Sequence, residues 1–392
     1  MSIVGQQQHV DVRRQVEQAY EARFGAPPAF LVRAPGRVNL IGEHTDYNDG
    51  FVLPAAIDRE FWIALRPAPG DRVRAHSLEF GEAEFSLDEL TPGEEGWVEY
   101  IRGVAWVLIS AGHHLKGWEG VLGGNVPIGA GLSSSAAVEM AVMRAFGAVA
   151  GLPWDGREAA LLGRRVENEW IGVNSGIMDQ MAVAMGRAGH ALLIDCRSLD
   201  ARAVALPPGL ALVVLDTGTR RGLVDSAYNE RRRQCEAAAA RFGVDALRDV
   251  DRPMLESAAD LDPLVLRRAR HVVTENERTL EAAEALGAGE LDRLGRLMDE
   301  SHASLRDDFE VSTDALDTIV ELARNQPGCH GARMTGAGFG GCAVAAVDTS
   351  ISEAFAGTVA RLYREALGLE PQTYICRAAE GASLIERQRS RK

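Results

Sequence analysis

Cysteine is scarce in this chain of 392 residues, and long apolar runs are missing. The five cysteines are scattered and form no C-x-x-C pair, which fits free thiols in a reducing compartment and argues against a structural zinc site. No apolar run approaches the length that spans a bilayer, and the first residues carry no signal-like apolar stretch. We therefore expect a cytoplasmic protein without a membrane partner.

Positive charge is also in deficit. The chain has 42 Lys and Arg against 56 Asp and Glu, a formal net charge of -14. This balance disfavours nucleic acid and anionic membranes as partners. It leaves a nucleotide ligand open, because backbone N–H groups and a metal ion can hold phosphates locally. Hydrophobic content of 46% and charged content of 25% are typical of a soluble globular protein.

The pattern of apolar residues predicts a mixture of helices and strands. Predicted helices cover residues 12–24, 100–110, 159–170, 223–242, 263–286, 289–307, 313–325 and 351–367, with a further helix opening near residue 134. Predicted strands cover residues 30–32, 51–57, 61–65, 117–126, 190–196, 331–335, 341–347 and 372–377. The absence of strict βαβ alternation indicates an α+β fold.

The length of the chain favours two domains. A turn-rich stretch at residues 197–209, with Pro207 and Pro208, gives a soft boundary. We expect an N-terminal domain of residues 1–205 and a C-terminal α+β domain of residues 206–392.

The densest group of polar side chains lies between two apolar runs, at residues 33–54. It contains Arg37, Glu43, His44, Asp46 and Asp49 with Gly36, Gly42 and Gly50. An ordinary connecting loop does not need so many hydrogen-bonding groups, so we expect a pocket for a small molecule rich in hydroxyls. Its carboxylates would repel an anionic substrate and accept hydrogen bonds from a neutral polyol. Asp49, beside Gly50, is better explained by a turn.

A second segment combines glycines and serines between a predicted strand and a predicted helix. It contains Gly129, Gly131, Ser133, Ser134 and Ser135. Such glycines turn backbone N–H groups toward a ligand, and a helix N-terminus favours an anion, so we expect a phosphate-binding loop. The segment lacks the Lys of a P-loop and the second glycine of a nucleophile elbow. The alternative, a serine that caps the helix, accounts for one serine and not for three.

Two acids in the middle of the chain each allow two interpretations. Asp179 follows Gly176 in a stretch rich in methionine, where a carboxylate needs a partner or a purpose, although it could also cap a helix. Glu167 lies in the charged run 164–169, which is typical of a solvated helix face. It is also a candidate magnesium ligand, because magnesium commonly takes one carboxylate and phosphate oxygens.

A second glycine loop, residues 334–341, contains a G-x-G-x-x-G match at Gly336, Gly338 and Gly341. A strand and not a helix is predicted after it, so we reject a dinucleotide-binding fold and a dehydrogenase. A tight hairpin and a loop pressed against a ligand in another domain remain equally open.

Together these segments resemble the galactokinase family of the galactokinase–homoserine kinase–mevalonate kinase–phosphomevalonate kinase (GHMP) superfamily. The resemblance covers almost the whole chain. It rests on residues 36–50, 127–137 and 333–342, with weaker support from 176–180 and 226–236. The first motif is specific to sugar 1-kinases, whereas the second and third mark only the superfamily. The resemblance implies a two-domain small-molecule kinase with its active site in the cleft between the domains.

The resemblance also implies roles for individual residues. Asp179 and Arg37 match the catalytic pair, and Ser135 and Glu167 match magnesium ligands. The sugar-site positions match Arg37, Glu43, His44, Asp46, Gly176, Asp179 and Tyr228. The nucleotide positions match Gly129, Gly131, Ser133, Ser134 and Ser135, with Trp97 on the adenine side. Ala337 stands where many relatives carry glycine, and we expect it to be tolerated if its φ is negative.

The implied reaction is ATP- and Mg²⁺-dependent phosphorylation of galactose at its anomeric hydroxyl, giving galactose 1-phosphate and ADP in the Leloir pathway. Asp179 would either take the hydroxyl proton or only orient that hydroxyl. One alternative is a kinase for N-acetylgalactosamine or another hexose. A second is a non-catalytic sensor, which would lack part of the stretch 134–137 that is intact here. We expect a monomer or a weak homo-oligomer.

Overall fold

The computed structural model describes residues 11–94, 96–219, 224–258 and 261–385. Its largest sheet has six strands in the order β13-β1-β3-β6-β4-β5. These are β1 (Phe30–Asn39), β3 (Pro54–Pro67), β4 (Arg72–Ser77), β5 (Gly81–Ser86), β6 (Trp118–Gly124) and β13 (Ser383–Ile385). Neighbouring strands are antiparallel except for β4 and β6, which pair in parallel.

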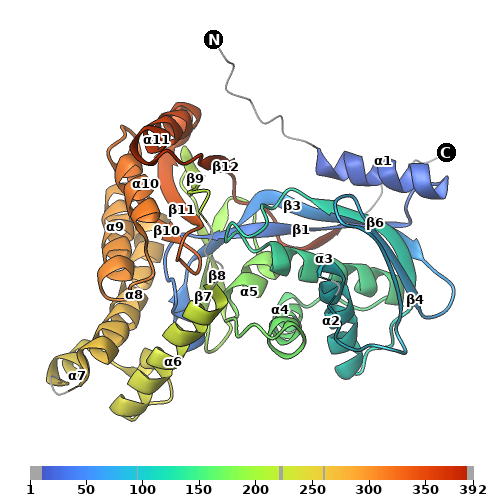
Figure 1. Ribbon diagram of the computed structural model, residues 1–392, viewed down its shortest axis with the longest axis horizontal. Helices are drawn as coiled ribbons and strands as arrows, with labels where there is room; N and C mark the ends of the chain where they lie inside the picture. Colours follow the sequence, from blue (N-terminus) through green and yellow to red (C-terminus); the bar gives the residue numbers. More distant parts are fainter. Residues whose placement is uncertain (1–10, 95, 220–223, 259–260, 386–392) are drawn as a thin grey trace.

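Helices cover both faces of this sheet (Figure 1). On one face lies α1 (Val12–Phe24), which buries Val12, Val16 and Tyr20 at the predicted spacing of four residues. On the other face lie α2 (Trp97–Ser110), α3 (Ser134–Ala150) and α4 (Gly156–Arg165). The main apolar core of this half is therefore the layer between the sheet and α2–α4.

The second half is built on a four-stranded antiparallel sheet in the order β10-β11-β9-β12. Its strands are β9 (Leu210–Asp216), β10 (Cys329–Thr335), β11 (Cys342–Asp348) and β12 (Gln372–Cys376). Its helices are α6 (Val224–Phe242), α7 (Arg252–Ser257), α8 (Pro263–Ala288), α9 (Leu291–Asp307), α10 (Asp314–Arg324) and α11 (Ser352–Leu367). All of these helices except α7 match predicted ones to within three residues.

A small third sheet lies between the two larger ones. It consists of β2 (Phe51–Val52), β7 (His190–Asp195) and β8 (Ala201–Ala205), in the order β2-β7-β8. The helix α5 (Met178–Met185) packs beside it, in the middle of the molecule (Figure 1). This central helix carries Asp179.

The two halves share apolar packing. Val38 and Leu40 from the first half lie in one buried cluster with Val344 and Tyr374 from the second. The last described strand, β13, returns to the first sheet and pairs with β1. The mixture of sheets and helices confirms the α+β class, whereas the division between residues 205 and 206 stays a prediction.

Several local predictions were wrong. The segment read as a loop from residue 33 continues as strand β1 as far as Asn39, with a β-bulge between Pro35 and Gly36. The helix predicted at 159–170 divides into α4 and a π-helix, Val166–Ile171. Strands β4, β5, β8, β9 and β13 and helix α7 were not predicted.

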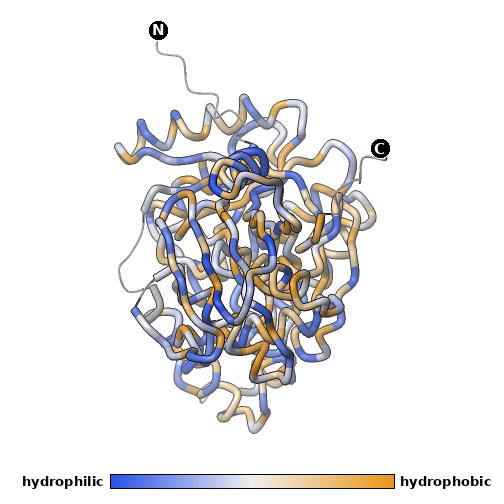
Figure 2. Tube along the Cα trace, turned by 90° about the vertical axis from the view of Figure 1, so that its right-hand side faces the viewer, coloured by the Kyte–Doolittle hydropathy of each residue, from blue (hydrophilic) through white to orange (hydrophobic). Residues whose placement is uncertain are grey.

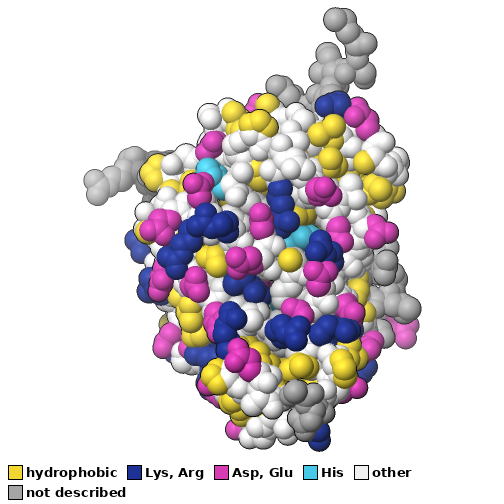
Figure 3. Space-filling view, turned by 90° about the vertical axis from the view of Figure 1, so that its left-hand side faces the viewer, with side chains coloured by type: hydrophobic (Ala, Val, Ile, Leu, Met, Phe, Trp, Pro, Cys, Tyr) yellow, Lys and Arg dark blue, Asp and Glu magenta, His cyan; other side chains and the backbone are white. Residues whose placement is uncertain are grey.

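Along the described residues, hydrophobic and hydrophilic positions are interspersed (Figure 2). None of the helices in the described part of the chain has the length and apolar character to cross a membrane. The face beside the C-terminal helices carries basic and acidic side chains interspersed (Figure 3). Exposed ion pairs include that of Arg361 with Glu365 on α11.

Candidate active site

A cavity of about 330 Å³ lies where the first sheet, α3, α5 and the second half of the chain meet. Fifteen of the residues around it come from before residue 205, and the others are Tyr228, Asn229, Gly336 and Ala337. It brings together Arg37, Glu43, His44, Asp46, Gly129, Gly131, Ser133, Ser134, Ser135, Glu167, Gly176, Asp179 and Tyr228. Every predicted site residue except Trp97 therefore lines one cavity.

Asp179 is held by two donors from different parts of the chain. Arg37 Nε donates to Asp179 Oδ1 at 2.8 Å, and Ser133 Oγ donates to Asp179 Oδ2 at 2.5 Å. Arg37 Nη1 also donates to the Gly131 carbonyl at 2.6 Å. The Asp179 carboxylate is in the first turn of α5 and not at its N-cap position, so the capping alternative is wrong.

The glycine–serine segment wraps around the start of α3. Gly129 and Gly131 have φ values of 69° and 74°, and Ser133, at the N-cap position, has φ 60°. The Ser133 side chain makes no capping hydrogen bond, because its hydroxyl is turned to Asp179. The serine-cap alternative is therefore wrong, and the α3 N-terminus is open toward the cavity.

Glu167 is a buried side chain, only 9% exposed, at the start of the π-helix. Its Oε1 accepts from Ser135 Oγ at 2.9 Å. Burial raises the pKa of Glu167, and the nearby Asp179 charge adds to that rise. The solvated-face alternative is therefore wrong for Glu167. It holds for its neighbour Glu169, which forms an exposed ion pair with Arg165.

His44 is buried against aromatic rings, with φ 63°. Its Nε2 lies 3.2 Å from the Ala337 carbonyl, which can only accept, so Nε2 carries the proton. Its Nδ1 then accepts from the Tyr47 hydroxyl at 2.9 Å. Burial lowers the pKa of His44 to about 3, which keeps the ring neutral at physiological pH. Tyr228 packs 5.6 Å from this ring, centroid to centroid.

Asp46 and Gly176 touch across the cavity. A Cβ on Gly176 would lie 1.8 Å from Asp46 Oδ2, so this position accepts no side chain while Asp46 keeps its place. Burial, together with the Asp179 and Glu43 charges, raises the pKa of Asp46 to about 6. Asp46 is thus ionised at pH 7 only by a narrow margin.

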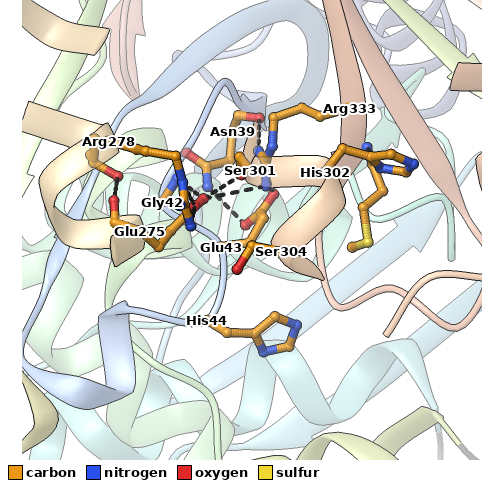
Figure 4. A network of polar contacts seen from close by, with 12 residues as sticks. Asn39, Gly42, Glu43, His44, Glu275, Arg278, Ser301, His302, Ser304 and Arg333 are labelled. Carbon is orange, nitrogen blue, oxygen red and sulfur yellow. Dashed lines mark hydrogen bonds and ion pairs between the residues drawn. The ribbon is translucent and has the colours of Figure 1, made fainter. Parts of the chain in front are cut away.

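Glu43 belongs to a buried polar network drawn in Figure 4. Its Oε2 accepts from Asn39 Nδ2 at 2.8 Å. Its Oε1 accepts from the Gly336 backbone N–H at 2.7 Å and from Thr335 Oγ1 at 3.0 Å. The second glycine loop is therefore a hairpin between β10 and β11, as the first alternative predicted, and its Gly336 and Ala337 line the cavity; contact with a ligand stays a prediction.

The same network contains residues that the sequence analysis missed. Arg333 is fully buried, with Nη1 donating to the Leu40 carbonyl at 3.1 Å and lying 3.5 Å from Glu43 Oε1. Glu275 accepts from Ser301 Oγ at 2.6 Å (Figure 4). For Glu275 the signal was its place on the apolar stripe of a long helix, where a carboxylate needs a partner, and for Arg333 it was its place at the start of the motif 333–342.

A second cavity of about 590 Å³ adjoins the first and shares Ser134 and Ser135 with it. Trp97 and Tyr100 from α2 line it, so Trp97 lies beside the phosphate loop and not in the first cavity. Large apolar side chains at its rim are solvent-exposed, Phe80 to 53% and Ile128 to 62%. Its lining, which includes Trp97, Phe80 and Ile128, suits an apolar ring system.

Two smaller expectations were met. Asp49 has a left-handed φ of 58°, ends a 3-10 turn and pairs with Arg197 at 3.2 Å, in agreement with the turn interpretation. Ala337 is not among the residues with a positive φ, so its side chain is tolerated. In the described residues the cysteines are free.

Three family models match the chain. They are the galactokinase galactose-binding signature at residues 18–67, the GHMP kinases N terminal domain at 99–187 and the GHMP kinases C terminal at 247–364. The mevalonate kinase structure from Methanococcus jannaschii has TM-score 0.63 and 18% identity, covering 89% of this chain and 98% of that one, a likeness of fold alone. Fold and site thus define a small-molecule kinase of the GHMP superfamily.

Two relatives narrow the class further. A galactokinase from Roseiflexus sp. (strain RS-1) is 48% identical over 378 residues, which are 95% of this chain and 97% of that protein. The crystal structure of Lactococcus lactis galactokinase complexed with galactose has TM-score 0.90 and 37% identity, covering 94% and 98% of the two chains. The chain belongs to the galactokinase family and is a kinase.

Proposed function

We propose that this enzyme transfers the γ-phosphoryl group of ATP to the anomeric hydroxyl of galactose. The observation that carries the proposal is the arrangement of Arg37, Asp179 and Ser133 at the centre of one cavity. Phosphoryl transfer needs positioned reactants and neutralised charge more than covalent chemistry. Arg37 is placed to balance charge on the transferring group and to hold Asp179. Asp179 then takes the proton of the sugar hydroxyl or orients that hydroxyl.

The sugar would occupy the part of the cavity lined by acids and aromatic rings. Asp46 and Glu43 are carboxylates that accept hydrogen bonds from hydroxyls, and neutral His44 and Tyr228 add polar edges. Gly176 supports the proposal because only glycine lets the chain pass so close to Asp46. Buried acceptors of this kind discriminate between epimers, because a misplaced hydroxyl leaves an acceptor unpaired.

The nucleotide would extend from the phosphate loop into the adjoining cavity. Ser134 and Ser135 line both cavities, whereas Gly129, Gly131 and Ser133 line the first one. The α3 N-terminus favours the negative charge of a triphosphate. Trp97 is then placed for the adenine ring.

The proposed magnesium site can be compared with the donor atoms that this ion prefers. Ser135 and Glu167 already meet at 2.9 Å at the cavity wall, and oxygen donors are those that magnesium prefers. The described residues offer no group of three acidic, histidine or cysteine side chains for a metal, so the phosphates and water would complete the coordination. When bound, the ion would neutralise phosphate charge.

The remaining parts of the proposal concern the whole protein. We propose a cytoplasmic enzyme whose partners are galactose and magnesium ATP, present as a monomer or a weak homo-oligomer. The cavity would lie in the cleft between domains of residues 1–205 and 206–392.

A coupled ADP-release assay over a panel of hexoses tests the proposed function. Galactose should give the highest kcat/KM and glucose, its C4 epimer, a far lower one. A strong preference for N-acetylgalactosamine would show that this sugar, and not galactose, is the substrate. No ADP release with any hexose, despite measurable binding of galactose and ATP, would favour a sensor.

A further inference from the structure

Helix α8 carries three buried polar side chains that the proposed mechanism does not use. They are His271, Glu275 and Asn276, which are 0%, 0% and 8% exposed. All three contact the segment of residues 42–51, which supplies carboxylate and imidazole groups to the cavity. In the described part of the chain, the residues that line the cavity do not include these three, so their contribution to the site goes through that segment.

Two of the contacts hold the start of the segment. Gly42 N–H donates to Glu275 Oε1 at 3.0 Å (Figure 4). His271 Nε2 lies 3.1 Å from the Glu43 carbonyl, which can only accept, so Nε2 carries the proton and donates. The peptide group between Glu43 and His44 is therefore fixed from α8. Both of these residues line the cavity.

A third contact holds the end of the segment. Asn276 Oδ1 accepts from the Phe51 backbone N–H at 2.9 Å. A Cβ on Gly50 would lie 2.3 Å from the same oxygen, so the backbone passes directly against the Asn276 side chain. The helix α8 thus binds backbone groups near both ends of the segment.

The backbone between these contacts has conformations that need support. His44 and Asp49 have φ values of 63° and 58°. A left-handed conformation is unfavourable for residues other than glycine and persists where the surroundings impose it. The ring of Phe309 adds to that support, because its centroid lies 4.8 Å from that of His44 and 4.5 Å from that of His271.

We propose that His271, Glu275 and Asn276 are positioning residues that hold segment 42–51 in the geometry that binds galactose. The proposal rests on the proposed function, since that function assigns the segment to galactose. Groups that bind a ligand need a supporting shell, and a displacement of about one ångström can cost a hundredfold in rate. A helix of the second half thereby sets the affinity of a site whose carboxylates come from the first half.

Three variants test the contacts at the two ends of the segment. His271→Leu keeps a bulky side chain but removes the donor to Glu43, and Asn276→Leu removes the acceptor for Phe51. Each should raise the Kd and the KM for galactose by about tenfold or more, with smaller changes in kcat and in the KM for ATP. His271→Gln places an amide N–H near the position of Nε2–H and should restore the Kd to within about threefold of wild type.

Hydrogen exchange without any sugar supplies a readout that does not depend on activity. The amides of residues 42–51 should exchange faster in His271→Leu and Asn276→Leu than in wild type. His271→Gln should show nearly the protection of wild type in the same segment.

The matched control is Tyr363→Phe on α11. Tyr363 is fully buried, and its hydroxyl donates to the Thr217 carbonyl at 3.1 Å, so this variant also removes one buried bond to a backbone carbonyl. It should lower the urea midpoint while leaving the Kd for galactose and the exchange of residues 42–51 unchanged.

The outcomes separate the two proposals. Folded His271→Leu and Asn276→Leu proteins that bind galactose like wild type would overturn the positioning role. An equal rise of the Kd in Tyr363→Phe would overturn it too, because the effect would then be a general loss of stability. Faster exchange in both Leu variants, with a wild type that binds no galactose, would leave the support of the segment standing and refute the proposed function.

Discussion

Asp179 shows how much one carboxylate depends on its two donors. Arg37 fixes one oxygen and Ser133 the other, so the side chain cannot rotate freely toward the cavity. Charge-assisted hydrogen bonds of this kind are stronger than neutral ones and set the geometry of the group. The same guanidinium also holds the Gly131 carbonyl, which joins the acid to the phosphate loop through one residue.

Replacement of this acid should separate chemistry from binding. Asp179→Asn keeps the shape but cannot take a proton, so kcat should fall by about a hundredfold or more. The equilibrium Kd for galactose, measured by calorimetry, should change only a few-fold. The control is Asp200→Asn, whose exposed carboxylate pairs with Arg157 and should leave both quantities unchanged. A near wild-type kcat for Asp179→Asn would show that Asp179 is not the catalytic aspartate.

Gly176 offers a steric test of the sugar side. Gly176→Ala would place its Cβ 1.8 Å from Asp46 Oδ2, so one of the two segments must move. We expect the KM for galactose to rise at least tenfold while the KM for ATP changes little. Gly357→Ala is the matched control, because a Cβ there meets nothing within 4 Å. That helical site should gain about 0.5–1 kcal/mol of stability. An unchanged galactose KM would place the sugar away from Asp46.

At the scale of elements, local patterns were enough for most of the helices and for fewer of the strands. The helix α1 and the long helices of the second half follow repeats within one segment. The strand β1 continues past Gly36 because it pairs with β3 and because Arg37 N donates to the Leu132 carbonyl at 3.1 Å. Both contacts involve distant residues, so no local pattern reveals them.

The residues of the candidate site also divide into those that local patterns reveal and those that they do not. The residues in glycine-rich motifs could be predicted, because the residue types and spacing within a motif indicate its chemistry. The π-helix at Val166–Ile171, which sets Glu167 against Ser135, could not, since its pattern is that of an ordinary helix. The β4 and β5 strands carry exposed charges on one face and so lack the apolar run of a typical strand.

The network of Figure 4 connects four elements through Arg333 on β10. Arg333→Met should lower the free energy of unfolding by about 3–5 kcal/mol, because it leaves buried Glu43 and Glu275 without a cation they share. Ser301→Ala removes one hydrogen bond to a charged group and should cost about 1.5–3 kcal/mol. Urea unfolding measures both quantities.

An arginine in an exposed pair serves as the control for this network. Arg361 lies on α11 with a side chain that is 55% exposed and pairs with Glu365. Arg361→Met should change stability by less than about 1 kcal/mol. Equal losses for Arg333→Met and Arg361→Met would mean that the buried network adds no stability.

At the scale of the whole molecule, the site lies where the two halves pack together, and its groups titrate in opposite senses. Burial lowers the pKa of His271, a residue of α8, to about 4. Its Nε2 is 3.1 Å from the Glu43 carbonyl. Burial, with the Asp179 and Glu43 charges, raises the pKa of Asp46 to about 6. The stability of the folded chain is therefore linked to pH through both groups.

The sign of each linkage follows from the proton balance. Between pH 6.5 and 4 the unfolded chain protonates His271 and the folded chain does not, so His271 costs stability as the pH falls. Between pH 3.8 and 6 the folded chain keeps a proton on Asp46 that the unfolded chain has lost, so Asp46 costs stability as the pH rises. A difference of one bound proton between the folded and the unfolded chain changes the free energy of unfolding by about 1.4 kcal/mol per pH unit.

Two variants should therefore show opposite slopes in urea unfolding between pH 4 and 6. The free energy of unfolding of His271→Gln, minus that of wild type, should rise by about 1.4 kcal/mol for each unit by which the pH falls, because the variant no longer carries the histidine linkage. For Asp46→Asn, the same difference in the free energy of unfolding should instead rise by a similar amount for each unit by which the pH rises. Differences from wild type remove the groups common to both proteins. Parallel slopes for the two variants would refute these protonation states, and with them the neutral imidazole and the marginal carboxylate at the join of the two halves.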